Sequence, residues 1–211
     1  VGSMGLLIVP VTLRNYGVSE EWVPVTSGGG EVLYLAHGPG ANGYFHTVPF
    51  VKPSPWREHE DFRVEAARRL GKPVSRGEAS SYWRGEAWSK IRQDPLRLLR
   101  LAWLKARIFL HDLEVPDSAD YRLWRRYVPL MWVLPTFGWC VGLAGVGAVT
   151  CWRRLKSCQL LLGLIGVHLV SVMVTYNFGR FRIGMMPLCL LLAAEGAVWL
   201  WNRLRVEGDR S

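Results

Sequence analysis

Two arginines lie in a short break between two strongly apolar stretches of the sequence. Arg180 and Arg182 flank a phenylalanine within the run NFGRFRIGMMP at 177–187, and the residues on both sides are mostly apolar. Guanidinium groups this close together suit a phosphate, because each planar group can donate two parallel hydrogen bonds to its oxygens. The alternative is that both side chains only anchor a helix end by reaching the lipid headgroups.

The composition indicates that these arginines belong to a membrane protein. The chain has 211 residues, of which 50% are hydrophobic, and the part after residue 128 is mostly apolar. Its formal net charge is +9, yet the sequence shows no basic aromatic platform or recognition helix, so nucleic acid is not an expected partner. Anionic membrane lipid and phosphate-bearing lipid substrates suit a basic membrane protein better.

Three blocks in the apolar part are long enough to cross a bilayer, which takes about 20 residues. We place them at 129–151, 158–176 and 183–201, followed by a cytoplasmic tail at 202–211. The opening stretch 1–13 is apolar but too short to span. We interpret it as the end of a transmembrane helix whose beginning is missing, so the sequence is expected to be a fragment of a multi-pass protein.

The basic turn between the first two spans sets the orientation. Residues 152–157 carry three cations and no acid, and the positive-inside rule places such a turn in the cytoplasm. The link at 177–182 and the segment 14–128 then lie outside, since long loops translocate largely regardless of their charge. This orientation puts Arg180 and Arg182 at the external membrane boundary.

The segment before the spans is expected to form a small external domain. We place this domain at 14–93. Residues 16–60 are rich in Gly, Pro, Ser and Thr, with β-prone runs such as EVLYL at 31–35, so we expect an α+β or irregular fold. Within it, residues 59–70 look helical and stop at a glycine, and the next helix begins at Ser75 or Ser80.

A strong helix start follows this domain, with Asp94 as the N-cap and Pro95 in the first helical position. The helix carries four cations along LRLLRLAWLKARIFL, which makes a membrane-crossing position costly. We therefore expect 94–128 to contain a basic amphipathic helix in the membrane interface, with Lys105 near its middle. The alternative is a core helix of a soluble domain.

A further cation is expected near the arginine pair. Arg14 follows directly on the first apolar stretch, which places it at the same external boundary as Arg180 and Arg182. A phosphate just below this boundary is what a polyprenyl-phosphate carrier presents. We therefore predict that the three arginines bind a carrier phosphate, with Asn15 beside Arg14 and with Lys105 as a weaker partner.

Several modest motifs, in a fixed order, carry a family resemblance. They are IVPVTLRNYGV, VPVTSGGGEVLYLAHGPGANGYF, QDPLRLLRLAWLKARIFLHDLEVPDSADY and YNFGRFRIGMMPLCLLLAAEGAVWL. Together they resemble the C-terminal half of bacterial family 39-type membrane glycosyltransferases, the dolichyl-phosphate-mannose protein mannosyltransferase-like group that includes aminoarabinose transferases. The motifs Arg14-Asn15 and Arg180-Phe-Arg182 contribute most to this resemblance. The chain departs from the family at 36–39, where AHGP stands in place of the frequent Gly-Asn-Asn-Pro.

The resemblance implies a membrane all-α helical bundle of the C-type glycosyltransferase kind, in the bacterial inner membrane, with residues 14–128 outside. Such enzymes transfer a sugar from a polyprenyl-phosphate donor to a protein, lipid or glycan acceptor. Their catalytic aspartate, often with a divalent metal, lies in a first external loop, upstream of this chain. The resemblance therefore assigns no catalytic residue and no cofactor here, only contacts to the carrier phosphate and the acceptor.

A second function class remains open, a non-catalytic membrane scaffold or subunit whose external domain binds a partner. Upstream sequence separates the two classes. Further apolar spans and an acidic first external loop would favour the transferase, whereas a natural start at Met4 would favour the scaffold.

The remaining chemistry-bearing residues are expected to be structural. The four cysteines are expected to be buried free thiols, and the acidic clusters at 58–61 and 112–120 to be mostly solvated surface, with Glu114 as the exception. The five histidines show no metal-ligand spacing. His168 and Glu195 lie inside predicted spans, at depths that differ by roughly 6 Å when counted from the cytoplasmic ends, so we hypothesise that they face each other as a pair.

Overall fold

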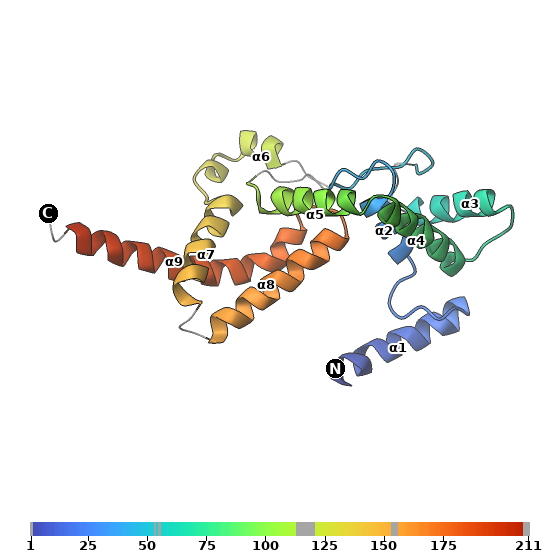
Figure 1. Ribbon diagram of the computed structural model, residues 1–211, viewed down its shortest axis with the longest axis horizontal. Helices are drawn as coiled ribbons and strands as arrows, with labels where there is room; N and C mark the ends of the chain where they lie inside the picture. The colour runs from blue at the N-terminus through green and yellow to red at the C-terminus, as the bar shows by residue number, and fades with distance from the viewer. Residues whose placement is uncertain (1, 53, 55, 113–120, 153–155, 209–211) are drawn as a thin grey trace. The chain divides into compact units, whose positions relative to one another are not determined.

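The computed structural model describes residues 2–208 except for 53, 55, 113–120 and 153–155 (Figure 1). Over these residues the fold is all-helical, with nine α-helices, one 3-10 turn and no β-strand. The chain divides into two compact units, Val1–Leu99 and Arg100–Ser211, called here the N-terminal and the C-terminal unit. Each is described by itself.

The N-terminal unit contains four helices and the start of a fifth. These are α1 (Gly2–Ser19), α2 (Gly29–His37), α3 (Glu58–Leu70), α4 (Arg76–Gln93) and the first residues of α5 (Pro95–Leu110). The boundaries of the last three confirm the predicted signals. Gly71 ends α3 in the left-handed region at φ 68°, and Asp94 accepts a hydrogen bond of 2.9 Å from the Arg97 N–H at the start of α5.

A capping box begins α4. The Ser75 hydroxyl accepts a hydrogen bond from the Glu78 N–H at 3.2 Å, and the Glu78 carboxylate accepts one from the Ser75 N–H at 2.9 Å. This reciprocal pair satisfies two N–H groups that would otherwise have no partner. Of the two predicted starting residues, Ser75 is therefore the N-cap and Ser80 lies inside the helix.

Aromatic side chains form the core of this unit. The Trp83 ring is fully buried against Phe62 at 5.3 Å and Tyr34 at 4.6 Å between ring centroids, and its indole N–H donates to the Phe62 carbonyl at 3.0 Å. Gly30 lets α2 approach α4 closely, because a Cβ at this position would come within 1.7 Å of the Ser80 carbonyl oxygen. These contacts join α2, α3 and α4 around one cluster.

The β-prone run at 31–35 is helical, so the predicted α+β alternative is wrong for the described residues. Its residues belong to α2, whose Tyr34 and Leu35 are buried in the aromatic core. Packing against α4 decides the conformation here, as tertiary contacts often override a weak local preference. The longest stretch without a helix in this unit lies between α2 and α3.

The C-terminal unit contains the rest of α5 and the apolar helices. They are α6 (Tyr121–Tyr127), the 3-10 turn η1 (Pro129–Trp132), α7 (Phe137–Cys151), α8 (Lys156–Val174) and α9 (Phe181–Gly208). Three segments are long and apolar enough to cross a membrane, at Pro129–Cys151, Lys156–Val174 and Phe181–Glu207. Large apolar side chains such as Val149, Val167 and Ile183 are exposed on them, as expected of a membrane protein.

The first predicted span is not one continuous helix. Its start forms η1, and α7 begins only at Phe137, after Pro135 has interrupted the helical backbone. Within α7, Gly147 lies against α9, where a Cβ would come within 1.9 Å of the Leu192 carbonyl oxygen. Gly196 faces Leu143 in the same way at 2.2 Å, so small residues let the two helices pack closely.

The cysteines depart from expectation in one pair. Cys140 and Cys189 are buried free thiols, as predicted, but Cys151 and Cys158 form a disulfide with their Cα atoms 6.2 Å apart. The two residues lie at the end of α7 and near the start of α8, so the disulfide links these two helices. Sequence spacing alone gives no sign of this pairing, because no CxxC motif is present.

Candidate functional site

The predicted phosphate-binding arginines lie where the link between α8 and α9 meets the end of α5. Arg182 is buried, at 7% exposure, and its guanidinium donates two hydrogen bonds of 2.8 Å, to the Ile108 and His111 carbonyl oxygens. These oxygens lie at the C-terminal end of α5, where carbonyl groups have no partner within the helix. Arg182 therefore caps α5 from a position 71 to 74 residues away in the sequence.

An aromatic ring and a carboxylate lie beside Arg182. Its guanidinium lies 4.7 Å from the centre of the Phe137 ring, at the start of α7. Asp112 lies close by and accepts a hydrogen bond of 2.9 Å from the Gly138 N–H. A hydrogen bond from Thr136, the Gly138 N–H and the charge of Arg182 hold the pKa of Asp112 below its ordinary value. The end of α5, the link and the start of α7 are thereby joined.

Asn177 fastens the same link to α5. The side chain is 1% exposed, and its amide N–H donates to the Lys105 carbonyl oxygen at 3.0 Å. The side-chain oxygen of this amide is buried and has no hydrogen-bond partner within the described part of the chain. Sequence reasoning missed this residue, although a single Asn between Tyr176 and Phe178 at the end of an apolar span is the kind of polar group that usually needs a partner.

Lys105 lies on the buried face of α5. Its side chain is fully buried, and its ammonium donates to the Met173 carbonyl oxygen, near the end of α8, at 3.0 Å. Burial lowers the pKa of Lys105 from 10.5 to about 8, because the charged form loses its hydration. The ammonium is thus directed toward the helix end rather than toward solvent.

Arg180 is placed differently from Arg182, although the two are only two residues apart. It is exposed, and its guanidinium lies 4.8 Å from the centre of the Phe178 ring and 5.8 Å from that of Phe181. Of the predicted pair, Arg180 is therefore the exposed residue and Arg182 the buried one.

Arg14 and Asn15 belong to the N-terminal unit. The first helix extends beyond its predicted end, to Ser19, so both residues lie within α1. Asn15 donates to the Val23 and Val25 carbonyl oxygens at 3.0 and 3.3 Å, which folds the following segment back along the helix. Arg14 is exposed. The predicted meeting of Arg14 with Arg180 remains a prediction, because the two residues lie in separate units.

The hypothesised pair of His168 and Glu195 is wrong. The His168 ring nitrogen bonds to the Phe181 carbonyl oxygen at 2.8 Å, at the start of α9, and Glu195 lies 14 residues further along that helix, about 21 Å away at helical rise. The depth comparison assumed that the last span ends at 201. It also assumed that the cytoplasmic ends of the two helices lie level, whereas His168, in the second half of α8, lies beside the first residue of α9.

The acidic residues provide no metal site among the described residues. No group of three His, Cys, Asp or Glu side chains there could hold a metal ion. Glu114, Asp117 and Asp120 of the second acidic cluster lie outside the described residues. In the first cluster, Glu60 pairs with Arg63 at 2.6 Å and Asp61 accepts from the Lys52 N–H at 2.9 Å. Both side chains thus have local structural roles.

Comparison with known proteins does not identify a family for this chain. No protein family, no characterised protein and no solved structure matches the chain.

Proposed function

We propose that this chain is part of a membrane-bound glycosyltransferase that takes its sugar from a polyprenyl-phosphate donor. Three membrane-crossing helices and the sequence resemblance support the proposal, but neither identifies a ligand. The observation that carries it is the position of Arg180, an exposed guanidinium stacked on two aromatic rings beside the end of an apolar helix. A cation in this setting suits the phosphate of a lipid carrier.

The proposal divides the predicted residues into two roles. Arg180 would contact the carrier phosphate, whereas Arg182 and Lys105 would hold the link that presents it, through the α5 and α8 carbonyl groups. Arg14 would join Arg180 only in the assembled protein. A fixed cation beside the departing phosphate would stabilise the negative charge that develops as the glycosidic bond breaks.

The test is sugar transfer by the full-length protein with Arg180→Ala. We expect kcat/KM for the polyprenyl-phosphate sugar to fall about tenfold or more, because one charge-assisted contact in the transition state is lost. Arg180→Lys should keep part of the activity, since the point charge remains while the fork is lost. Normal transfer by Arg180→Ala would contradict the assignment.

Arg203→Ala provides a matched control. Arg203 also lies over an aromatic ring, Trp199 at 5.4 Å, but near the opposite end of α9, where it pairs with Glu207 at 3.5 Å. If Arg180→Ala slows sugar transfer through a change of surface charge or the loss of stacking, Arg203→Ala will slow it as well. If Arg180→Ala slows transfer because a contact to the carrier phosphate is lost, Arg203→Ala will leave transfer unchanged.

The non-catalytic scaffold is the competing function. It predicts that the full-length protein transfers no sugar from any polyprenyl-phosphate donor, whichever residue stands at position 180.

A further inference from the structure

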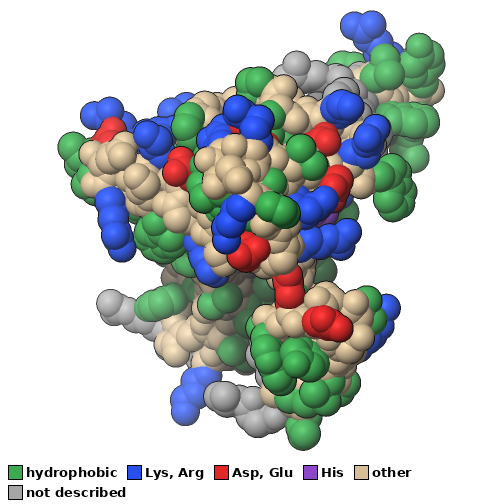
Figure 2. All heavy atoms as spheres, turned by 90° about the vertical axis from the view of Figure 1, so that its right-hand side faces the viewer, with side chains coloured by type: hydrophobic (Ala, Val, Ile, Leu, Met, Phe, Trp, Pro, Cys, Tyr) green, Lys and Arg blue, Asp and Glu red, His purple; other side chains and the backbone are tan. Residues whose placement is uncertain are grey.

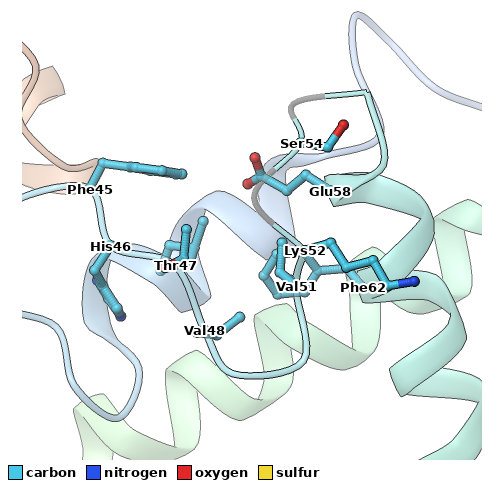
Figure 3. A pocket seen from close by; sticks show the side chains of 10 residues that line it. Phe45, His46, Thr47, Val48, Val51, Lys52, Ser54, Glu58 and Phe62 are labelled. Carbon is cyan, nitrogen blue, oxygen red and sulfur yellow. The ribbon is translucent and has the colours of Figure 1, made fainter. Parts of the chain in front are cut away.

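A cavity lies in the N-terminal unit, between the start of α3 and the loop that precedes it. Its volume is about 240 Å³, slightly below the ~300–1,000 Å³ of typical small-molecule sites. Apolar side chains make up most of its wall, among them Leu35, Phe45, Val48, Val51 and Phe62 (Figure 3). A space of this size and lining suits a compact ligand with an apolar body.

One carboxylate extends into this apolar space. Glu58 belongs to the first turn of α3, and its side chain reaches from the helix toward Phe45 (Figure 3). It is half-buried, and within the described part of the chain it forms no hydrogen bond and no ion pair. Loss of hydration is the main cause that raises the pKa of Glu58, while the charge of His59 opposes the rise and that of Glu31 adds to it.

Three basic residues of this region are directed elsewhere. The His59 ring bonds to the buried carboxylate of Glu31. The Lys52 ammonium points away from the cavity, and the His46 ring is turned away from Glu58 (Figure 3). Glu60 and Asp61 each have a partner, Arg63 and the Lys52 N–H. Of this acidic cluster only Glu60 is exposed, so the sequence-based prediction of a solvated surface does not hold for the half-buried Glu58 and Asp61.

The surrounding surface does not show the same pattern. Figure 2 shows basic and acidic side chains interspersed over the face of the unit that includes α3 and α4. Surface carboxylates in such a setting are paired or hydrated, and they need no ligand. A carboxylate held among phenylalanine and valine side chains instead gains from a partner that brings both a positive charge and an apolar body.

We propose that this cavity binds a small organic amine, whose ammonium group pairs with the Glu58 carboxylate and whose apolar body fills the space between Phe45, Val51 and Phe62. The aromatic rings add attraction for the ammonium through their electron-rich faces. The cavity volume restricts the ligand to a compact molecule with about a dozen non-hydrogen atoms. This site is independent of the proposed glycosyl transfer.

The probes for the test are 2-phenylethylamine and 2-phenylethanol, which share a shape and differ in charge. Binding to the whole chain in detergent is measured at pH 7 by calorimetry, after subtraction of titrations into detergent alone. We expect a millimolar dissociation constant for the amine, at least tenfold lower than that for the alcohol. Equal affinities for the two probes, or no binding of the amine, would overturn the proposal.

Two variants locate the site. Glu58→Gln should weaken binding of the amine about tenfold, to the affinity of the alcohol, and should leave the affinity for the alcohol unchanged. Val51→Trp should abolish binding of both probes by filling the cavity. Glu60→Gln, a charge removal on the same helix outside the cavity, should change nothing. Amine binding that survives in both Glu58→Gln and Val51→Trp would place the ligand elsewhere and refute the assignment.

The circular dichroism spectrum and the melting temperature of each variant show whether it folds. Glu58→Gln removes a half-buried charge without a protein partner, so we expect the fold to be retained. A Glu58→Gln protein that is folded and keeps the full preference for the amine over the alcohol contradicts the proposal directly.

Discussion

Two kinds of cation contact can be compared, one on α3 of the N-terminal unit and one at helix ends of the C-terminal unit. In the N-terminal unit, arginines on α3 pair with acids on the same helix, as Arg63 does with Glu60 at 2.6 Å and Arg68 with Glu65 at 2.7 Å. In the C-terminal unit, the buried cations Lys105 and Arg182 bond to backbone carbonyl oxygens at helix ends. In the first kind of contact the arginine stays partly in solvent, so the pair is worth little, whereas the second kind replaces hydration at buried sites.

The contribution of an arginine or lysine to stability therefore depends on the group to which it bonds. A surface pair can be separated with little loss, because water takes over both charges. A buried cation that caps a helix end cannot be removed so easily, since its carbonyl partners are left without hydrogen bonds. Three experiments test the comparison, in order of decreasing expected effect.

The largest effect is expected from Arg182→Ala. The substitution removes two hydrogen bonds of 2.8 Å to the end of α5 and leaves buried carbonyl groups without partners. We expect a loss of about 3 kcal/mol or more in the free energy of unfolding. Thermal unfolding in detergent, followed by circular dichroism, measures this loss.

Arg180→Ala is the control for that experiment, because it removes the neighbouring exposed arginine. Its loss should stay within about 1 kcal/mol, the range of an exposed cation–π contact. If the two substitutions destabilise the protein equally, the assignment of Arg182 as a buried cap and Arg180 as a surface group is wrong.

The second effect is a dependence of stability on pH through Lys105. The pKa of this side chain is about 8 in the folded chain against 10.5 as the ordinary value, so the unfolded state holds the proton more tightly between these limits. The free energy of unfolding should therefore rise as pH increases from about 8 to 10.5, by a total of about 3 kcal/mol from this group. Below pH 8 Lys105 is protonated in both states, so it adds no pH dependence there.

Lys105→Met removes the titrating group while keeping an apolar side chain of similar length. We expect the rise in stability between pH 8 and 10.5 to disappear in this variant, as measured by unfolding at a series of pH values. A rise of the same size in Lys105→Met would show that other groups cause it.

The smallest effect is expected at Glu65, in the N-terminal unit. Its hydrogen bonds to Arg68 and Arg69 lower the pKa from 4.5 to about 2, so their stabilisation is fully present above pH 4.5 and is lost as pH falls toward 2. Because Arg68 is 71% exposed, solvent weakens the pair, and Glu65→Gln should cost only about 1 kcal/mol at pH 7. Comparing the unfolding free energies of both proteins at pH 7 and pH 3 checks the sign, since the difference should shrink at the lower pH.

Local signals in the sequence were enough to predict several elements of the fold. Helix ends are marked by Ser75, Asp94 and the glycine after Leu70, through contacts with residues only a few positions away. The apolar blocks can be recognised from their composition. The helix α2 could not be predicted in this way, because its conformation depends on packing against α4, about 50 residues later. The break before Phe137 was visible in Pro135, but the apolar composition of the block outweighed it in the prediction.

The site was harder to predict than the fold. The pattern Arg180-Phe-Arg182 drew attention to the link, yet it could not show that Arg182 is buried against carbonyl groups at the end of α5 while Arg180 is exposed. A backbone carbonyl oxygen is present at every residue, so a cation that bonds to one leaves no complementary residue in the sequence. Glu58 was missed for a related reason, since its apolar surroundings come from the folded loop rather than from its sequence neighbours.

The length of α9 has a consequence for its charged end. Its 28 residues, Phe181–Gly208, extend for about 42 Å at helical rise, against a hydrocarbon layer of about 30 Å. An average tilt of about 20° shortens this reach only to about 39 Å, so roughly the last two turns stand clear of the hydrocarbon. These turns carry Arg203, Arg205 and Glu207, whose charges can then stay hydrated beyond the hydrocarbon layer.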